Sequence, residues 1–142
     1  MTVKDFKPYE SAVQVKPEKL IKEMVQQLVE HPPLHHICVV EENGELQGMI
    51  NRKKFFQAVF SHHVSADSRV TRLYNLLTAE KAGELMISNI ITIMEDEDID
   101  SVIKKMIEHD LFEIPVVDKY KHVLGLLTSG KILKKLAKAQ GL

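Results

Sequence analysis

The feature that most restricts how this chain can fold is a corner between a strand and a helix that occurs twice. The stretches GMINRKKFF (residues 48–56) and GLLTSGKIL (residues 125–133) each run from an apolar strand through a turn into a helix. In both, a glycine and two apolar residues precede a small polar residue, which is Asn51 or Thr128. A lysine follows three positions later. A chain that builds the same corner twice is predicted to contain the same structural unit twice.

The repeat extends beyond the corners. Aligning them also aligns the strands HICVV and EIPVV, and one residue of slippage upstream aligns two helical stripes. The spacing within each stripe predicts a buried helix face. The stripes are Ile21, Met24, Val25, Leu28 and Val29 in the first copy and Ile99, Val102, Ile103, Met106 and Ile107 in the second. Each copy therefore reads strand, helix, strand, turn, strand, helix, with Asn43-Gly44 favouring a tight turn in the first.

Two βαββα copies favour an α/β (α+β) fold in which the motifs pack as an intramolecular pseudo-dimer. Each copy alone would leave one face of its sheet bare, and two copies can cover each other. The predicted organisation is a first motif with an N-terminal segment over residues 1–60, an ordered helical linker over 61–80 and a second motif over 81–142. The linker is predicted to be ordered because it is not rich in Gly and Ser.

The composition restricts the functional class. The chain has 142 residues, 27% of them charged, and a net charge of -1, which gives no support for general nucleic-acid binding. Its single cysteine, Cys38, excludes an internal disulfide framework and fits a reducing compartment. No apolar run approaches the roughly 18 residues of a membrane span, and the N-terminus has no secretory signal. We therefore expect a cytoplasmic protein with no membrane partner.

The sequence predicts neither a metal site nor catalysis. The seven histidines show no spacing typical of zinc ligands. The acidic run MEDEDID lacks the glycine of a calcium loop, and its Asp96 and Asp98 are predicted to cap the helix that starts at Ile99. No activated nucleophile, phosphate-binding glycine loop or acid–base pair is present. We therefore do not expect an enzyme.

These motifs resemble a tandem pair of CBS domains, the modules named after cystathionine β-synthase. AGELMISNIITI is similar to the family's first helix and strand, and FEIPVVDKYKHVLGLLTSGKIL to its central strand, hairpin and final corner. HICVV and GMINRKKFF of the first copy are more divergent but in register. The resemblance implies a disc-shaped Bateman module that is regulatory and usually dimeric. It also implies a regulatory ligand such as AMP, ADP, ATP or S-adenosylmethionine in the cleft between the motifs.

The corners depart from the family pattern at one position. That pattern is Thr or Ser, two variable residues and then Asp, where the hydroxyl contacts phosphate and the Asp contacts the ribose hydroxyls. Thr128 and Asn51 occupy the first position here, whereas Lys131 and Lys54 stand where the family has Asp. A lysine only donates hydrogen bonds, so it cannot accept them from ribose hydroxyls.

The lysines suggest an anion near each corner. A cation in the first turn of a helix is unfavourable by about 0.3–1 kcal/mol when exposed, and a bound phosphate would reverse the sign. Alternatively, the lysines extend into water and Thr128 serves only as an N-cap. The predicted nucleotide-binding residues are Ile91, Ile114, Pro115, Val116, Thr128, Ser129 and Lys131 in the second copy and Asn51, Arg52 and Lys54 in the first.

Two functions remain open at this point. One is a stand-alone regulatory CBS pair that binds an adenine nucleotide or a related adenosyl ligand and signals its occupancy to an unknown effector protein. The other is a ligand-free scaffold for dimerisation or partner docking. Under both, a broad apolar helix face predicts a homodimer. That face consists of Phe55, Phe56, Val59 and Phe60.

Overall fold

The chain folds into two compact units, which are described separately below. The computed structural model describes residues 1–30, 36–60 and 79–141. One unit comprises Val13–Ile90 and is called the α1–α2 unit; the other comprises Met1–Ala12 with Ile91–Leu142 and is called the α5–α6 unit. The predicted helical linker falls mainly on residues 61–78, which lie outside the described residues.

The α1–α2 unit contains a three-stranded sheet in the order β1-β2-β3. Strand β1 is parallel to β2, and β2 is antiparallel to β3. The elements are β1 (Val13–Val15), α1 (Ile21–Glu30), β2 (His36–Val40), β3 (Leu46–Asn51), α2 (Arg52–Val59) and α4 (Ala82–Leu85).

The α5–α6 unit is built around the antiparallel pair β4-β5. Ile93 extends this pair on one side by a parallel bridge to Val116, and Glu10 extends it on the other by an antiparallel bridge to Leu126. The elements are the 3-10 helix η1 (Val3–Phe6), α5 (Ile99–Glu108), β4 (Glu113–Val117), β5 (Val123–Thr128) and α6 (Ser129–Ala139). The predicted α+β fold with a repeated unit is confirmed.

The predicted helix stripes form the cores of the two units only in part. Met24 of α1 and Val102 of α5 are fully buried, as the spacing indicates. Val29 and Ile107, which end the two stripes, are instead 69% and 75% exposed, so the stripe prediction was wrong for them. Each lies eight positions after the start of its stripe, which corresponds to a rotation of about 80° around the helix axis and away from the core.

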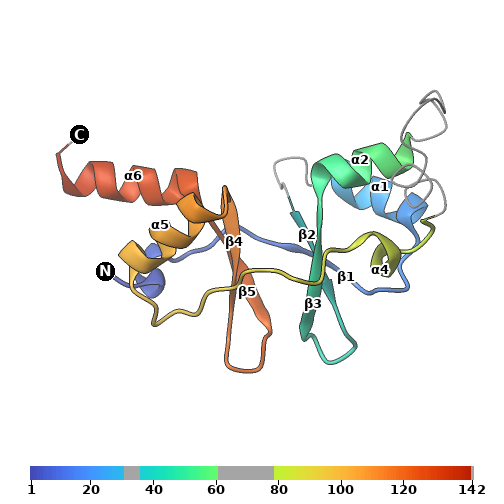
Figure 1. Cartoon of the computed structure of the whole chain (residues 1–142), viewed down its shortest axis with the longest axis horizontal. Coiled ribbons are helices and arrows are strands. Elements are labelled where there is room, and N and C mark those ends of the chain that lie inside the picture. Colours follow the sequence, from blue (N-terminus) through green and yellow to red (C-terminus); the bar gives the residue numbers. More distant parts are fainter. Residues whose placement is uncertain (31–35, 61–78, 142) are drawn as a thin grey trace. The chain divides into compact units, whose positions relative to one another are not determined.

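The segments that lead into the two motifs are exchanged between the units. Helix η1 stands first in the sequence, yet Val3 and Phe6 are buried in the core of the α5–α6 unit. Helix α4 precedes the second motif, yet Ala82 and Leu85 are buried in the core of the α1–α2 unit. In Figure 1 the blue turn of η1 accordingly lies beside the orange helix α5. The sequence repeats and the compact units therefore divide the chain differently.

The glycine that opens each repeated corner makes this exchange sterically possible. The backbones of Glu10 and Leu126 form hydrogen bonds of 3.0 and 2.8 Å, which bring the N-terminal segment across β5. A Cβ atom on Gly125 would lie 2.6 Å from Cβ of Tyr9. A Cβ atom on Gly48 of β3 would likewise lie 2.7 Å from the carbonyl oxygen of Ile87. Both glycines are needed because another segment of backbone crosses directly over them.

Candidate functional site

The corner between β5 and α6 uses several of its polar groups within the protein. Oγ1 of Thr128 accepts a hydrogen bond of 3.2 Å from the backbone N–H of Lys131, so Thr128 is the N-cap of α6. The N–H of Ser129 donates to the carbonyl oxygen of Phe112 at 2.8 Å. These two N–H groups are already bonded, so they are less available to an anion at this corner. The hydroxyl of Thr128 can still donate a hydrogen bond of its own.

The corner between β3 and α2 has the same construction. Oδ1 of Asn51 accepts a hydrogen bond of 2.7 Å from the backbone N–H of Lys54, so Asn51 is the N-cap of α2. Arg52 and Lys54 are half-buried, whereas Lys53 is exposed. The first turn of α2 contains no acidic residue. This corner is therefore more strongly cationic than the corner of α6, where Lys131 follows Ser129 and Gly130.

The predicted site residues of β4 do not all lie on one face of the sheet. Ile114 and Val116 are 0% exposed and pack in the core of the α5–α6 unit. Ile91 packs against the same core and is partly buried. Pro115 lies between Ile114 and Val116, so its side chain leaves the opposite face. A ligand on that face could contact Pro115 but only the backbone of its two neighbours.

The sequence analysis did not identify Glu113, which begins β4. It lies directly opposite Thr128 in the antiparallel register and is 5% exposed. It is the only buried charged or polar side chain in the part of the chain that the structure describes. In the other unit His36 lies opposite Asn51 in the same manner. Cross-strand register depends on how the hairpin folds, so the sequence alone does not signal this pairing.

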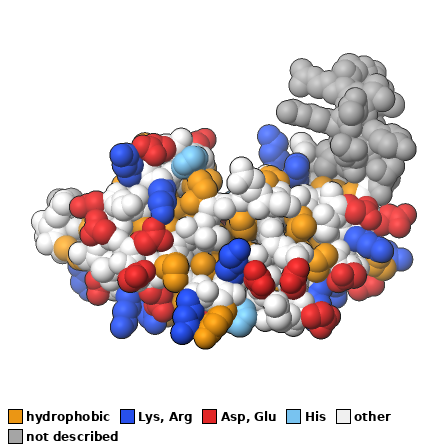
Figure 2. Space-filling model, turned by 60° about the horizontal axis from the view of Figure 1, so that its bottom comes forward, with side chains coloured by type: hydrophobic (Ala, Val, Ile, Leu, Met, Phe, Trp, Pro, Cys, Tyr) orange, Lys and Arg blue, Asp and Glu red, His pale blue; other side chains and the backbone are white. Residues whose placement is uncertain are grey.

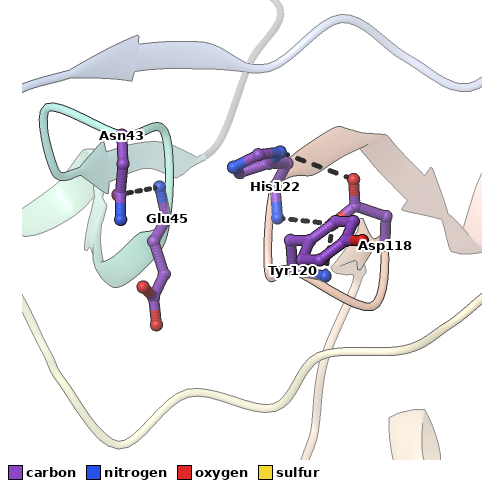
Figure 3. A network of polar contacts seen from close by, with 5 residues as sticks. All are labelled: Asn43, Glu45, Asp118, Tyr120 and His122. Carbon is purple, nitrogen blue, oxygen red and sulfur yellow. Dashed lines mark hydrogen bonds and ion pairs between the residues drawn. The ribbon is translucent and has the colours of Figure 1, made fainter.

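In each hairpin turn a polar side chain accepts hydrogen bonds from nearby backbone N–H groups (Figure 3). Asp118 accepts hydrogen bonds from the backbone N–H groups of His122 at 2.9 Å and Tyr120 at 2.8 Å, and the bond from His122 contributes most to lowering the pKa of Asp118. Oδ1 of Asn43 accepts a bond of 3.0 Å from the N–H of Glu45, in the turn that Asn43-Gly44 predicts. We therefore assign these groups a structural role.

The acidic run before α5 holds the N-terminal segment. Oε2 of Glu95 accepts a hydrogen bond of 2.7 Å from the hydroxyl of Tyr9 and pairs with the ammonium of Lys7 at 2.8 Å. Lys7 and then Tyr9 lower the pKa of Glu95, and burial raises the pKa of Tyr9. Asp98 caps α5 as predicted, whereas the predicted capping role of Asp96 was wrong, because only Asp98 stands at the N-cap.

The described residues meet the requirements of neither a metal site nor a membrane-spanning helix. They contain no group of three or more His, Cys, Asp and Glu side chains that could hold a metal ion. Four of the histidines, His31, His35, His62 and His63, lie outside the described residues. Cys38 is buried. Over the described ranges, no helix has the length and apolar character required to cross a membrane.

The apolar face predicted for α2 divides between core and surface. Phe55 is 6% exposed and belongs to the core of the α1–α2 unit, and Val59 packs partly against that core. Phe56 and Phe60 are 63% and 43% exposed. Their rings contact each other with centroids 4.8 Å apart. The exposed part of the face therefore consists of these two rings.

The fold and the repeated corners define a tandem pair of CBS domains. The family model described as the CBS domain matches residues 3–61 and 82–138, so the chain belongs to the CBS domain family. The resemblance seen in the sequence is confirmed.

Solved structures agree with this assignment. The chain is 27% identical to the CBS domain pair of protein MJ0100, solved in complex with 5′-methylthioadenosine and S-adenosyl-L-methionine, with a TM-score of 0.73 and coverage of 98% of both chains. A CBS domain-containing protein from Thermotoga maritima is 25% identical, with a TM-score of 0.75 and coverage of 97% and 95%.

The L-aspartate semialdehyde sulfurtransferase of Methanocaldococcus jannaschii is 34% identical over 112 residues, which is 79% of this chain and 19% of that protein. This chain thus spans about a fifth of the length of that relative.

Proposed function

We propose that this chain is a regulatory CBS pair that binds an adenosyl ligand at its strand-to-helix corners and transmits the occupancy to an effector protein. The ligand is an adenine nucleotide or a related adenosyl compound. The observation that carries the proposal is the 27% identity, over 98% of both chains, to a CBS domain pair solved with 5′-methylthioadenosine and S-adenosyl-L-methionine.

The proposal is for regulation rather than catalysis. The sulfurtransferase name belongs to a relative of which this chain spans 19%, so the similarity concerns only a part of that protein. The polar groups resolved at the corners act as helix caps, and none is arranged as a nucleophile with its base. Lys, Arg, Asp and Glu side chains are interspersed on the face shown in Figure 2, which favours a small ligand over a nucleic acid.

At each corner, polar and cationic side chains would contact the ligand's 5′ substituent. In the α5–α6 unit these are Thr128, Ser129 and Lys131; in the α1–α2 unit Asn51, Arg52 and Lys54 take the same places. The ammonium of a half-buried lysine beside a helix N-terminus can form a charge-assisted bond to a phosphate.

Equilibrium dialysis against adenosine, 5′-methylthioadenosine, S-adenosylmethionine, AMP and ATP tests the function, with the guanine counterparts as controls. We expect saturable binding of at least one adenosyl compound and none of its guanine counterpart. If no adenosyl compound binds, the proposal fails and the ligand-free scaffold is the better description.

In the same titrations, Lys131→Ala should weaken nucleotide binding about tenfold or more, because a charge-assisted contact is lost. The loss should increase from AMP to ATP as phosphates are added. Lys138→Ala removes the same charge from an exposed position in the last turn of α6 and should leave binding unchanged. Equal affinities for wild type and Lys131→Ala would remove Lys131 from the proposed site.

We further propose a homodimer that uses the exposed rings of Phe56 and Phe60. The second motif repeats an exposed apolar residue at the position equivalent to Phe56, since Leu133 is 69% exposed. Contiguous exposed apolar side chains mark interaction surfaces, and the contacting rings of Phe56 and Phe60 form such a pair.

Light scattering at micromolar concentration should therefore give twice the chain mass of 16.2 kDa. Phe56→Glu should shift the mass toward the monomer, because it places a charge in an apolar contact. Tyr120→Glu changes a hairpin residue with the same exposure, 63%, and should leave the dimer intact. A monomeric wild type would contradict the prediction.

A further inference from the structure

The corner of the α5–α6 unit brings together two residues whose side chains suit a nucleoside. Glu113 and Thr128 are directly opposed in the antiparallel register. Opposed residues project from the same face of a sheet, with Cβ atoms about 4.5–5.5 Å apart. Oγ1 of Thr128 is in turn bonded at 3.2 Å to the backbone N–H of Lys131. Glu113 therefore occupies the position next to Thr128 on the same face of the sheet, beside the first turn of α6.

The carboxylate of Glu113 is in an unusual environment for a charged group. The side chain is 5% exposed, and burying a charge is costly unless hydrogen bonds compensate for lost water. Glu113 already takes part in an interaction within the folded chain. Its two oxygens offer about four lone-pair positions, so it can accept further hydrogen bonds.

A ribose bound at this corner would need a hydrogen-bond acceptor for its hydroxyl groups. The neighbouring hydroxyls of a ribose donate two hydrogen bonds, and a carboxylate can accept both. Lys131 cannot accept either, because its ammonium only donates. The first turn of α6 contains no acidic residue, so among the described residues that form this corner Glu113 is the charged acceptor.

From this geometry we infer that Glu113 accepts the hydrogen bonds of the ribose hydroxyls of an adenosyl ligand bound to the α5–α6 unit. The inference rests on the proposed function and assigns the ribose contact to a strand residue instead of a helix residue. In the α1–α2 unit the residue in the same register is His36, opposite Asn51. That corner has no carboxylate in this position, so selectivity for the ribose hydroxyls belongs to the α5–α6 unit.

The test compares adenosine with 2′-deoxyadenosine by equilibrium dialysis of the full chain. The wild type should bind adenosine about tenfold more tightly, because one hydrogen bond to a charged acceptor is absent in the deoxy compound. Glu113→Gln keeps the side-chain size but removes the charge, and should reduce this ratio to about threefold or less. His36→Gln in the matching position of the other unit should leave the ratio at its wild-type value.

The outcomes separate the inference from the proposed function. If neither nucleoside nor any other adenosyl compound binds to the wild type, both fail. If adenosine binds but the wild type does not distinguish it from 2′-deoxyadenosine, the role of Glu113 is refuted while the function stands. The same holds if Glu113→Gln retains the full ratio. The wild-type comparison needs no variant, so the inference is testable even if Glu113→Gln does not fold.

Discussion

Replacing Phe6 with alanine should reduce the free energy of unfolding of the α5–α6 unit by about 3–5 kcal/mol. The ring of Phe6 is 1% exposed and packs in the core formed by α5, β4 and α6, although Phe6 stands far from them in the sequence. Removing it leaves a cavity that the surrounding packed core closes only in part. Since single domains are stable by only about 5–15 kcal/mol, the loss is large.

Urea denaturation followed by circular dichroism measures this effect. Phe112→Ala is the matched control, because Phe112 belongs to the same unit but is 69% exposed. A surface substitution of this kind should change stability by no more than about 0.5 kcal/mol. Equal effects of the two substitutions would show that the N-terminal segment does not belong to the core of this unit.

Replacing Gly125 with alanine should destabilise the same unit by about 1–3 kcal/mol, through overpacking. The added Cβ atom would lie 2.6 Å from Cβ of Tyr9 and 2.9 Å from the carbonyl oxygen of Glu10. The backbone φ of Gly125 is 153°, a conformation that residues with a side chain rarely adopt. Either the N-terminal segment or β5 must therefore move.

Gly130→Ala, which adds the same methyl group, should stabilise the unit instead of destabilising it. A Cβ atom on Gly130 would have nothing within 4 Å, and the residue lies in the first turn of α6. Alanine is the better helix former, so this variant should gain up to about 1 kcal/mol. Thermal melts of both variants should therefore move in opposite directions. A stabilised Gly125→Ala variant would contradict the close crossing of the N-terminal segment.

The sequence by itself determined the repeated unit, the family and the local structure of the corners. Asn51 and Thr128 cap their helices as short polar residues do when they stand directly before a helix. Met24 and Leu28 of α1 and Val102 and Met106 of α5 are buried, as their spacing requires. These features depend on residues only a few positions apart, so their physical causes are contained in short stretches of sequence.

The tertiary structure alone decided which segments complete each unit and which residues lie opposite one another in the sheets. Phe6 packs against elements of the second motif. The path of the N-terminal segment across β5 depends on the whole fold, and in the sequence only the repeated glycines are related to it. Side chains alternate along β4, so Ile114 points into the core and Glu113 to the opposite face. The register of β4 and β5 then decides that Thr128 is the residue opposite Glu113. Register and crossing are set by contacts between distant residues, which the local pattern of a sequence does not contain.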